Sequence, residues 1–185
     1  MKNKRKKYTE YNKKDLIQIR KIYKSFKQCN TYIKEFDENE RMLNTPIVIS
    51  ETLVAYLYGY KRNTGCPGDL TNKHGLIVEV KTALVTKRKD LSSFSPSAKF
   101  SDLCYAELDL DNDTLTVWEL GLSSNDIEKI KVSQVDTVKD QKNGRRRPRF
   151  SIRKTIIESD NLEPDYIFNI KNLKIIGGKL CKNKS

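Results

Sequence analysis

Hydrophobic residues recur at helical spacing near the N-terminus. From Asp15 onward, apolar side chains stand three or four positions apart, and lysines fill many of the positions between them. The spacing predicts an amphipathic helix of roughly 20 residues, whose apolar stripe packs on the parent domain. A helical arm in a dimer is the alternative interpretation. The stripe consists of Leu16, Ile19, Tyr23, Phe26 and Ile33.

A second helix is predicted over residues 47–58. Thr45 offers a cap, Pro46 is a first-turn proline, the segment that follows is apolar with a helical pattern, and Gly59 ends it. Glu51 is the one acidic residue in this segment. The helix dipole alone accounts for an acidic residue in the first turn, and a role in a functional site is the alternative.

Residues 76–80 form a short apolar run bounded by Gly75, which predicts a strand buried on both faces of a sheet. Side chains alternate along a strand, so residues two apart share a face. One face would carry Ile77, Glu79 and Lys81, and the other Leu76, Val78 and Val80.

Asp69 precedes this strand after the turn dipeptide Pro67-Gly68. Residues 72–75 are polar and end in glycine, which favours a hairpin that brings the Asp69 carboxylate beside Glu79. Two carboxylates that point into one space repel each other unless a cation or a proton lies between them. The hairpin therefore predicts a site for a cation.

Hard oxygen ligands suit Mg²⁺, which binds one or two carboxylates together with phosphate oxygens. Asp69 and Glu79 would supply the carboxylates, and the backbone carbonyl of Val80 would be a further ligand. Lys81 would hold the attacking water or stabilise the charge that builds on a phosphate. The alternative is a solvated ion pair at a strand end. The apolar surroundings of Glu79 and Lys81 favour the functional interpretation.

Later in the chain, residues 103–109 and 114–120 read as strands, and the Asp111-Asn112-Asp113 segment between them predicts a hairpin with an exposed acidic tip. Tyr105 and Trp118 are predicted to be core aromatics. Residues 122–135 begin with Ser123-Ser124 and carry acidic residues in the first turns, which predicts a second covering helix.

The densest cationic stretch follows the turn at Asn143-Gly144. Arginine forks match phosphate oxygens and the edges of guanine. A strand from Arg149 to Ile157 would put Arg149, Ser151 and Arg153 on one face, and a solvated basic loop is the alternative. The candidate DNA contacts are Arg145, Arg146, Arg147, Arg149 and Arg153 here, with Lys87, Arg88 and Lys89 after the Glu79 strand.

The amino-acid composition limits the classes of binding partner and the cellular compartment. The 36 Lys and Arg against 24 Asp and Glu give a net charge of +12, which favours DNA, RNA or an acidic membrane as partner. No apolar run approaches the roughly 20 residues of a membrane span, and the basic residues 1–7 lack the apolar stretch of a secretion signal. Four dispersed cysteines and one histidine argue for free thiols rather than a zinc site. A cytoplasmic protein is predicted.

The 185 residues suffice for one domain with a proper core and are too few for two comfortable ones. Residues 1–14 are predicted to be a flexible basic tail and residues 15–185 a single domain. Within it, residues 15–45 would form a helical extension, and residues 46–160 would hold the catalytic core and the DNA-binding segments.

The pair of motifs Pro67-Gly68-Asp69 and Glu79-Val80-Lys81 resembles that of the PD-(D/E)xK nuclease superfamily, with one extra glycine before the aspartate. Residues 90–96 and 143–152 resemble stretches of small type II restriction endonucleases. The similarity runs from about Ser50 to Ile157. It implies a restriction-endonuclease-like α/β fold, with a central mixed β-sheet flanked by helices and the N-terminal helical extension.

The resemblance also implies a function: a Mg²⁺-dependent type II restriction endonuclease that cleaves double-stranded DNA, with Asp69, Glu79 and Lys81 as catalytic residues. By its order in the chain, Glu51 matches a helical acidic residue of the superfamily and would be a further metal ligand. Ser93 joins the candidate DNA contacts. Cleavage of both strands of a symmetric site predicts a homodimer. A cognate DNA methyltransferase would be a functional partner that protects the host.

Two alternatives stay open. A junction resolvase or a mismatch nickase of the same fold would share the site residues and differ in substrate. A basic nucleic-acid-binding protein without catalysis would use Asp69, Glu79 and Lys81 as a structural ion-pair network, and its binding would depend on salt but not on divalent metal.

Overall fold

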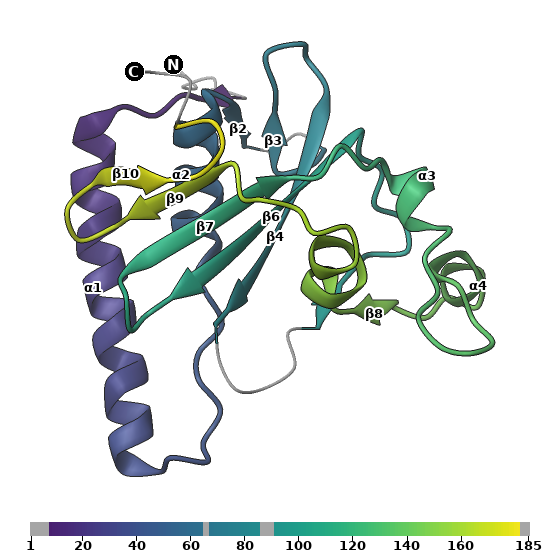
Figure 1. The fold of residues 1–185 in the computed structure, drawn as a ribbon, viewed down its shortest axis with the longest axis horizontal. Coiled ribbons are helices and arrows are strands. Elements are labelled where there is room, and N and C mark those ends of the chain that lie inside the picture. The colour runs from purple at the N-terminus through teal and green to yellow at the C-terminus, as the bar shows by residue number, and fades with distance from the viewer. Residues whose placement is uncertain (1–7, 65–66, 86–90, 182–185) are drawn as a thin grey trace, which may run out of the picture.

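The computed structural model describes residues 8–64, 67–85 and 91–181 (Figure 1). Within them, one mixed sheet has the strand order β1-β2-β3-β4-β6-β7-β9-β10. β4 and β6 are parallel, and the other neighbours pair antiparallel. A separate antiparallel pair joins β5 to β8. The strands are β1 (Tyr8–Thr9), β2 (Lys61–Asn63), β3 (Leu70–Thr71), β4 (Ile77–Leu84), β5 (Ser92–Ser93), β6 (Asp102–Asp109), β7 (Thr114–Glu119), β8 (Arg149–Phe150), β9 (Tyr166–Asn169) and β10 (Lys174–Gly177).

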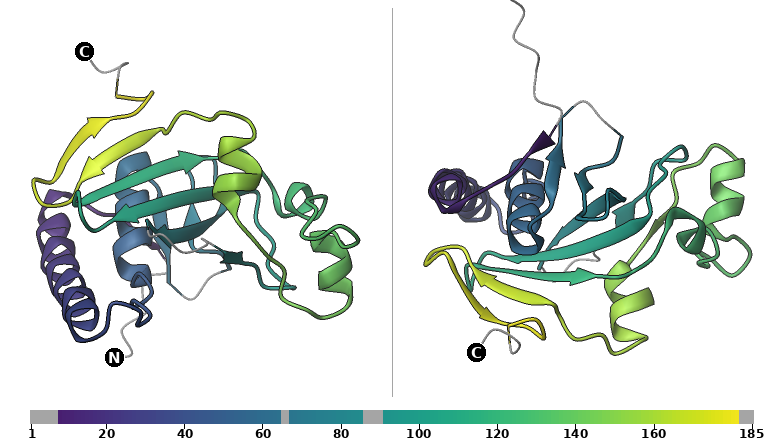
Figure 2. Two further views of the ribbon diagram at one scale, coloured as in Figure 1. Left: turned by 60° about the horizontal axis from the view of Figure 1, so that its bottom comes forward. Right: turned by 90° about the horizontal axis from the view of Figure 1, so that it is seen from above.

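Helical segments cover both faces of the large sheet (Figure 2). α1 and α2 share one apolar cluster with the sheet, which includes Leu53 and Val78. The opposite face packs Tyr105 and Trp118 against residues of the C-terminal half, such as Ile156. The predicted fold class, a mixed sheet flanked by helices with an N-terminal helical extension, is confirmed. The helical segments are α1 (Lys13–Phe36), α2 (Ile47–Tyr58), α3 (Ser124–Ile127), α4 (Val138–Asn143) and the π-helical turn η1 (Arg153–Glu158).

The N-terminal helix follows its sequence pattern but begins earlier than the predicted domain. Asn12 caps α1, because its side chain accepts a hydrogen bond from the Lys14 N–H at 2.8 Å and Asp15 completes the capping box. Ahead of the helix, Tyr8–Thr9 pairs with β2. The prediction that residues 1–14 form a flexible tail is therefore wrong for residues 8–14. Residues 1–7 lie outside the described part of the chain, and the single-domain division stays a prediction.

The second helix has the predicted bounds and lacks the predicted cap. α2 ends at Gly59, whose φ of 67° suits glycine better than other residues. Pro46 stands at the N-cap without a side-chain hydrogen bond. The buried hydroxyl of Thr45, the expected cap, has no hydrogen-bond partner among the described residues. Proline at the helix start supplies the conformation in its place.

The β6–β7 hairpin is confirmed, with Tyr105 fully buried and Trp118 at 7% exposure. The tip of this hairpin is less exposed to solvent than predicted. Asp113 accepts hydrogen bonds from Tyr23 and Lys27 of α1, both at 2.7 Å. The hairpin tip therefore fastens α1 to the sheet.

The covering helix predicted over residues 122–135 is wrong beyond its first turn. The Ser123 capping box is present, but α3 covers only Ser124–Ile127. Further on, the Ser133 hydroxyl accepts the N–H groups of Val135 and Asp136, at 3.3 and 2.9 Å. Such side-chain turns compete with helix formation. α4, which follows, was not predicted.

The strand predicted from Arg149 to Ile157 is also wrong after two residues. Ser151 accepts the Lys154 N–H through its hydroxyl and the Thr155 N–H through its carbonyl. These bonds start the π-helical turn η1, so Arg149, Ser151 and Arg153 do not share a strand face. Only the prediction that Phe150 and Ile152 are core residues is confirmed.

Candidate active site

The predicted hairpin between Asp69 and Glu79 is present. β3 and β4 are antiparallel, with Leu70 opposite Val78. The Asn72 side chain closes the turn, because it accepts the N–H groups of His74 and Leu76 at 3.0 Å. β4 begins at Ile77, so Leu76, predicted to be a core residue, stays 47% exposed in the turn.

Asp69 stands opposite Glu79 at the end of this hairpin. The Asp69 N–H donates to the Val78 carbonyl at 3.2 Å, which continues the pairing by one residue. Its carboxylate accepts the Val80 N–H at 2.8 Å. Burial and then the negative charge of Glu79 raise the pKa of Asp69 to about 6, although the Val80 N–H favours the charged form. The two carboxylates therefore repel each other, as the sequence predicts.

Lys81 and Glu79 lie on the same face of β4. The Lys81 Nζ is 2.6 Å from the Glu79 Oε1, and the two side chains are only 19% and 15% exposed. The same ammonium lies 5.1 Å from the centroid of the Phe94 ring. An ion pair and an aromatic face thus hold Lys81 beside the carboxylates.

Phe94 is a site residue that the sequence did not reveal. Its ring stacks on Phe150 with centroids 5.3 Å apart, and its N–H donates to the Pro148 carbonyl at 3.1 Å. β5 and β8 are thereby joined beside Lys81. The signal lay in residues 90–96, which carry a resemblance to restriction endonucleases, but nothing local indicates that Phe94 meets Lys81.

Glu51 is oriented by a neighbour on β2. Its side chain is buried and its Oε2 lies 2.6 Å from the Arg62 Nε. The charge of Glu51 makes a small contribution to the raised pKa of Asp69. Among the described residues, no three acidic, histidine or cysteine side chains form a group that could hold a metal ion. The role of Glu51 as a metal ligand stays a prediction.

The candidate DNA contacts differ in exposure and in ion pairing. Arg145, Arg147 and Arg149 are exposed, and Arg149 pairs in β8 opposite Ser93. The Ser93 hydroxyl is buried without a hydrogen-bond partner among the described residues. Arg146 is also exposed and forms an ion pair with Asp136 at 2.8 Å. Residues 87–89 (Lys87, Arg88 and Lys89) lie outside the described part of the chain.

Arg153 has partners within the protein. It forms ion pairs with the buried Glu107 and, at 2.9 Å, with Glu158. Glu107 lies on the sheet face of Lys81, because Lys81 pairs with Tyr105 and Ala83 with Glu107 in the β4–β6 register. Arg153 neutralises a buried carboxylate near the site, which favours a structural role over the predicted DNA contact.

A mixed sheet flanked by helices, with two carboxylates and a lysine on one hairpin, is the arrangement of a restriction-endonuclease-like nuclease. The model of the Bsp6I restriction endonuclease family matches residues 11–159. A curated relative, the type II restriction enzyme Bsp6I of Bacillus sp. (strain RFL6), is 37% identical over 157 residues, which cover 84% of this chain and 88% of the relative.

The chain therefore belongs to the Bsp6I restriction endonuclease family. This confirms the predicted class, a type II restriction endonuclease, whose substrate is DNA. No helix among the described residues is long and apolar enough to cross a membrane.

Proposed function

We propose that the chain hydrolyses double-stranded DNA in the presence of Mg²⁺, with Asp69, Glu79 and Lys81 as the catalytic residues. The observation that carries the proposal is the arrangement on the β3–β4 hairpin. Asp69 stands opposite Glu79, and Lys81 pairs with Glu79 at 2.6 Å on a partly exposed strand face.

The chemistry of the oxygen ligands fits Mg²⁺. The charge of Glu79 helps to raise the pKa of Asp69 to about 6, so a divalent cation near both carboxylates would relieve their repulsion. The N–H and C=O of one strand residue point to the same edge of the strand. Since the Val80 N–H faces Asp69, the Val80 carbonyl would face this region too. When bound, Mg²⁺ supplies Lewis-acid activation of the phosphate and of water.

The protein's own groups have distinct roles in this proposal. Asp69 and Glu79 bind and orient the cation, and the Val80 N–H keeps Asp69 in its conformation. The Lys81 ammonium positions the attacking water and stabilises the negative charge that develops on the scissile phosphate. Phe94 restricts the ammonium to the region above its ring.

The DNA-binding residues follow from exposure and charge. Arg145, Arg147 and Arg149 leave their guanidinium groups exposed for phosphates or base edges. Lys87, Arg88 and Lys89 follow β4 in the chain and would contact the backbone near the cut. A homodimer would present two copies of the site to the two strands, with a DNA methyltransferase protecting the host sites.

A plasmid-cleavage assay tests the proposal. Wild-type protein and Lys81→Ala are incubated with supercoiled DNA and Mg²⁺, and Lys73→Ala, which changes an exposed lysine of the same hairpin, is the matched control. We expect cleavage at defined sites by the wild type and the control, and at least a roughly 100-fold loss for Lys81→Ala. Equal rates for the two lysine variants would refute the proposal.

A further inference from the structure

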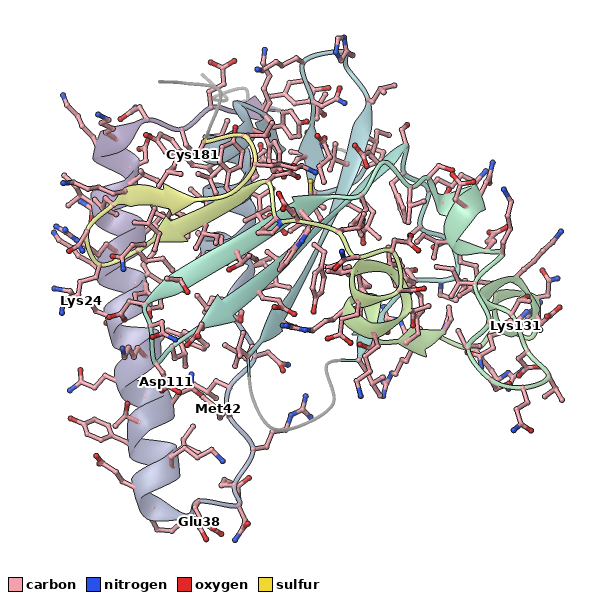
Figure 3. All side chains as sticks on the ribbon, viewed as in Figure 1. Lys24, Glu38, Met42, Asp111, Lys131 and Cys181 are labelled. Carbon is pink, nitrogen blue, oxygen red and sulfur yellow. The ribbon has the colours of Figure 1, made fainter. Side chains whose placement is uncertain are left out.

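A pocket of about 450 Å³ lies between α1 and two turns of the sheet, and none of its lining residues belongs to the candidate active site. We call it the α1 pocket. Its walls include Arg20, Lys24 and Lys27 of α1, Asp113 of the β6–β7 turn and Lys171 of the β9–β10 turn. Figure 3 labels Lys24 on α1 and, in the neighbouring β6–β7 turn, Asp111.

The α1 pocket has an excess of positive charge. Four of its lining residues are cationic and one, Asp113, is a carboxylate; Asp109 and Asp111 of the same hairpin lie close enough to act on the Tyr23 side chain. The cations are Arg20, Lys24, Lys27 and Lys171. Lys27 and Tyr23 bind the Asp113 carboxylate directly, each at 2.7 Å, whereas Lys171 acts on it only through its charge. Arg20, Lys24 and Lys171 therefore keep N–H donors for a ligand. A concave site with an excess of cations favours an anion.

Arg20 keeps part of its guanidinium group available for bidentate binding of an anion. One terminal nitrogen of Arg20, Nη1, donates a hydrogen bond to the Lys171 carbonyl at 3.1 Å, which ties α1 to the β9–β10 turn. The rest of the planar guanidinium still carries N–H donors, and Lys24 is exposed beside it. Two donors in one plane with ammonium groups nearby match the oxygens of a phosphate.

The pocket also has an exposed aromatic ring. Tyr32 is 58% exposed, although Tyr23 on the same helix is buried in the core. The Tyr32 hydroxyl accepts a hydrogen bond from the Gln28 Nε2 at 2.7 Å, which restrains the ring on the helix surface. Cations beside an exposed aromatic ring are the combination that binds unpaired nucleotides, because a base stacks on the ring while the cations bind its phosphate.

We propose that the α1 pocket binds a nucleotide whose base is unpaired, with the phosphate held by Arg20, Lys24 and Lys171 and the base stacked on Tyr32. The volume of about 450 Å³ lies within the usual range of small-molecule sites. Bases inside a duplex are already stacked on their neighbours and do not offer a free face. The ligand is therefore a free nucleotide or an unpaired nucleotide of a DNA strand.

Calorimetric titration without divalent metal tests the proposal, because no cleavage accompanies binding under these conditions. The probes are dAMP, a tetranucleotide of deoxyadenosine and a blunt-ended, fully paired duplex. The variants are Tyr32→Ala and the double variant Lys24→Glu/Lys171→Glu. The control, Lys14→Glu/Lys21→Glu, makes the same charge change on α1 at residues that do not line the pocket.

We expect saturable binding of dAMP and of the tetranucleotide to the wild type and to the control. Tyr32→Ala and Lys24→Glu/Lys171→Glu should each weaken binding by at least roughly fivefold, the lower end of the range for base stacking. The fully paired duplex should not compete for the pocket. Tighter binding of the tetranucleotide than of dAMP would identify a DNA strand as the source, and equal binding a free nucleotide.

Absence of saturable binding to the wild type would overturn the proposal, as would equal losses in the control and the pocket variants. The result is independent of the proposed catalytic site. Lys81→Ala should bind dAMP like the wild type, and Tyr32→Ala should retain plasmid cleavage and the thermal stability of the wild type.

Discussion

The Lys81 ammonium lies 5.1 Å from the centroid of the Phe94 ring, and the Glu79 carboxylate binds the same ammonium at 2.6 Å. Phe94 in turn stacks on Phe150, beside the exposed Arg149. The proposed catalytic lysine therefore packs on Phe94, and Phe94 packs against the segment that carries the candidate DNA-binding arginines. In the proposed function, these contacts link DNA binding to the position of Lys81 through Phe94.

Phe94→Leu should slow cleavage while the protein remains folded. Leucine keeps an apolar side chain but loses the cation–π interaction, worth about 0.5–2 kcal/mol, so we expect a roughly 2- to 30-fold fall in the single-turnover rate. Phe100→Leu is the matched control, because its ring packs in the same cluster 6.3 Å from Phe94. If both variants lose the same fraction of the rate, Phe94 acts only through packing.

Asp69→Asn should stabilise the metal-free protein. The substitution removes the repulsion with Glu79, and the amide oxygen still accepts the Val80 N–H, so the free energy of unfolding at pH 8 should rise by about 1 kcal/mol. Urea unfolding in EDTA measures this change. The variant should also lose cleavage and any stabilisation by Mg²⁺. The exposed Asp111→Asn should change none of the three, and a less stable Asp69→Asn protein would contradict the proposed repulsion.

The stability of the protein should depend on the protonation of Asp102. Burial, and then the hydrogen bond and charge of Glu119, raise the pKa of Asp102 to about 6 from 3.8. A carboxyl with a raised folded-state pKa contributes stability below the unfolded-state value, and this contribution is lost as the pH rises through the folded-state value. The relevant window is pH 4 to 6.

Asp102→Asn removes this titration. Between pH 4 and pH 7.5, the wild type should lose about 1 kcal/mol of unfolding free energy relative to the variant, because the partly exposed pair is screened by solvent. Urea denaturation at the two pH values measures the difference. Parallel pH profiles for the two proteins would show that Asp102 titrates normally in the fold.

Arg149→Ala and Arg153→Ala should have different consequences. Arg149 is exposed, so its loss should weaken DNA binding with little effect on protein stability. The slope of the logarithm of the binding constant against the logarithm of the salt concentration should become shallower by about one. Arg153 neutralises the buried Glu107, so its loss should cost about 1–2 kcal/mol of unfolding free energy. Fluorescence anisotropy at several salt concentrations and urea unfolding separate the two effects. Equal effects in both assays would contradict the assignment.

Local sequence signals predicted the structure correctly where a few neighbouring residues determine the backbone conformation. Gly59 ends α2, and the Asn72 turn brings Asp69 opposite Glu79. Local signals failed where side-chain turns or distant contacts decide the outcome. Ser133 and Ser151 redirect segments whose apolar spacing fits a longer helix or strand. The contact of Phe94 with Lys81 depends on the pairing of β5 with β8, which no short window of sequence contains.

The rate of duplex DNA cleavage as a function of Mg²⁺ concentration, compared between the wild type and Glu79→Gln, tests the central claim most directly. We predict that the wild-type rate rises with Mg²⁺ to a plateau and vanishes in EDTA, while Glu79→Gln is at least roughly 100-fold slower at every concentration. Cleavage by Glu79→Gln at the wild-type rate, or wild-type cleavage that persists in EDTA, would contradict the account.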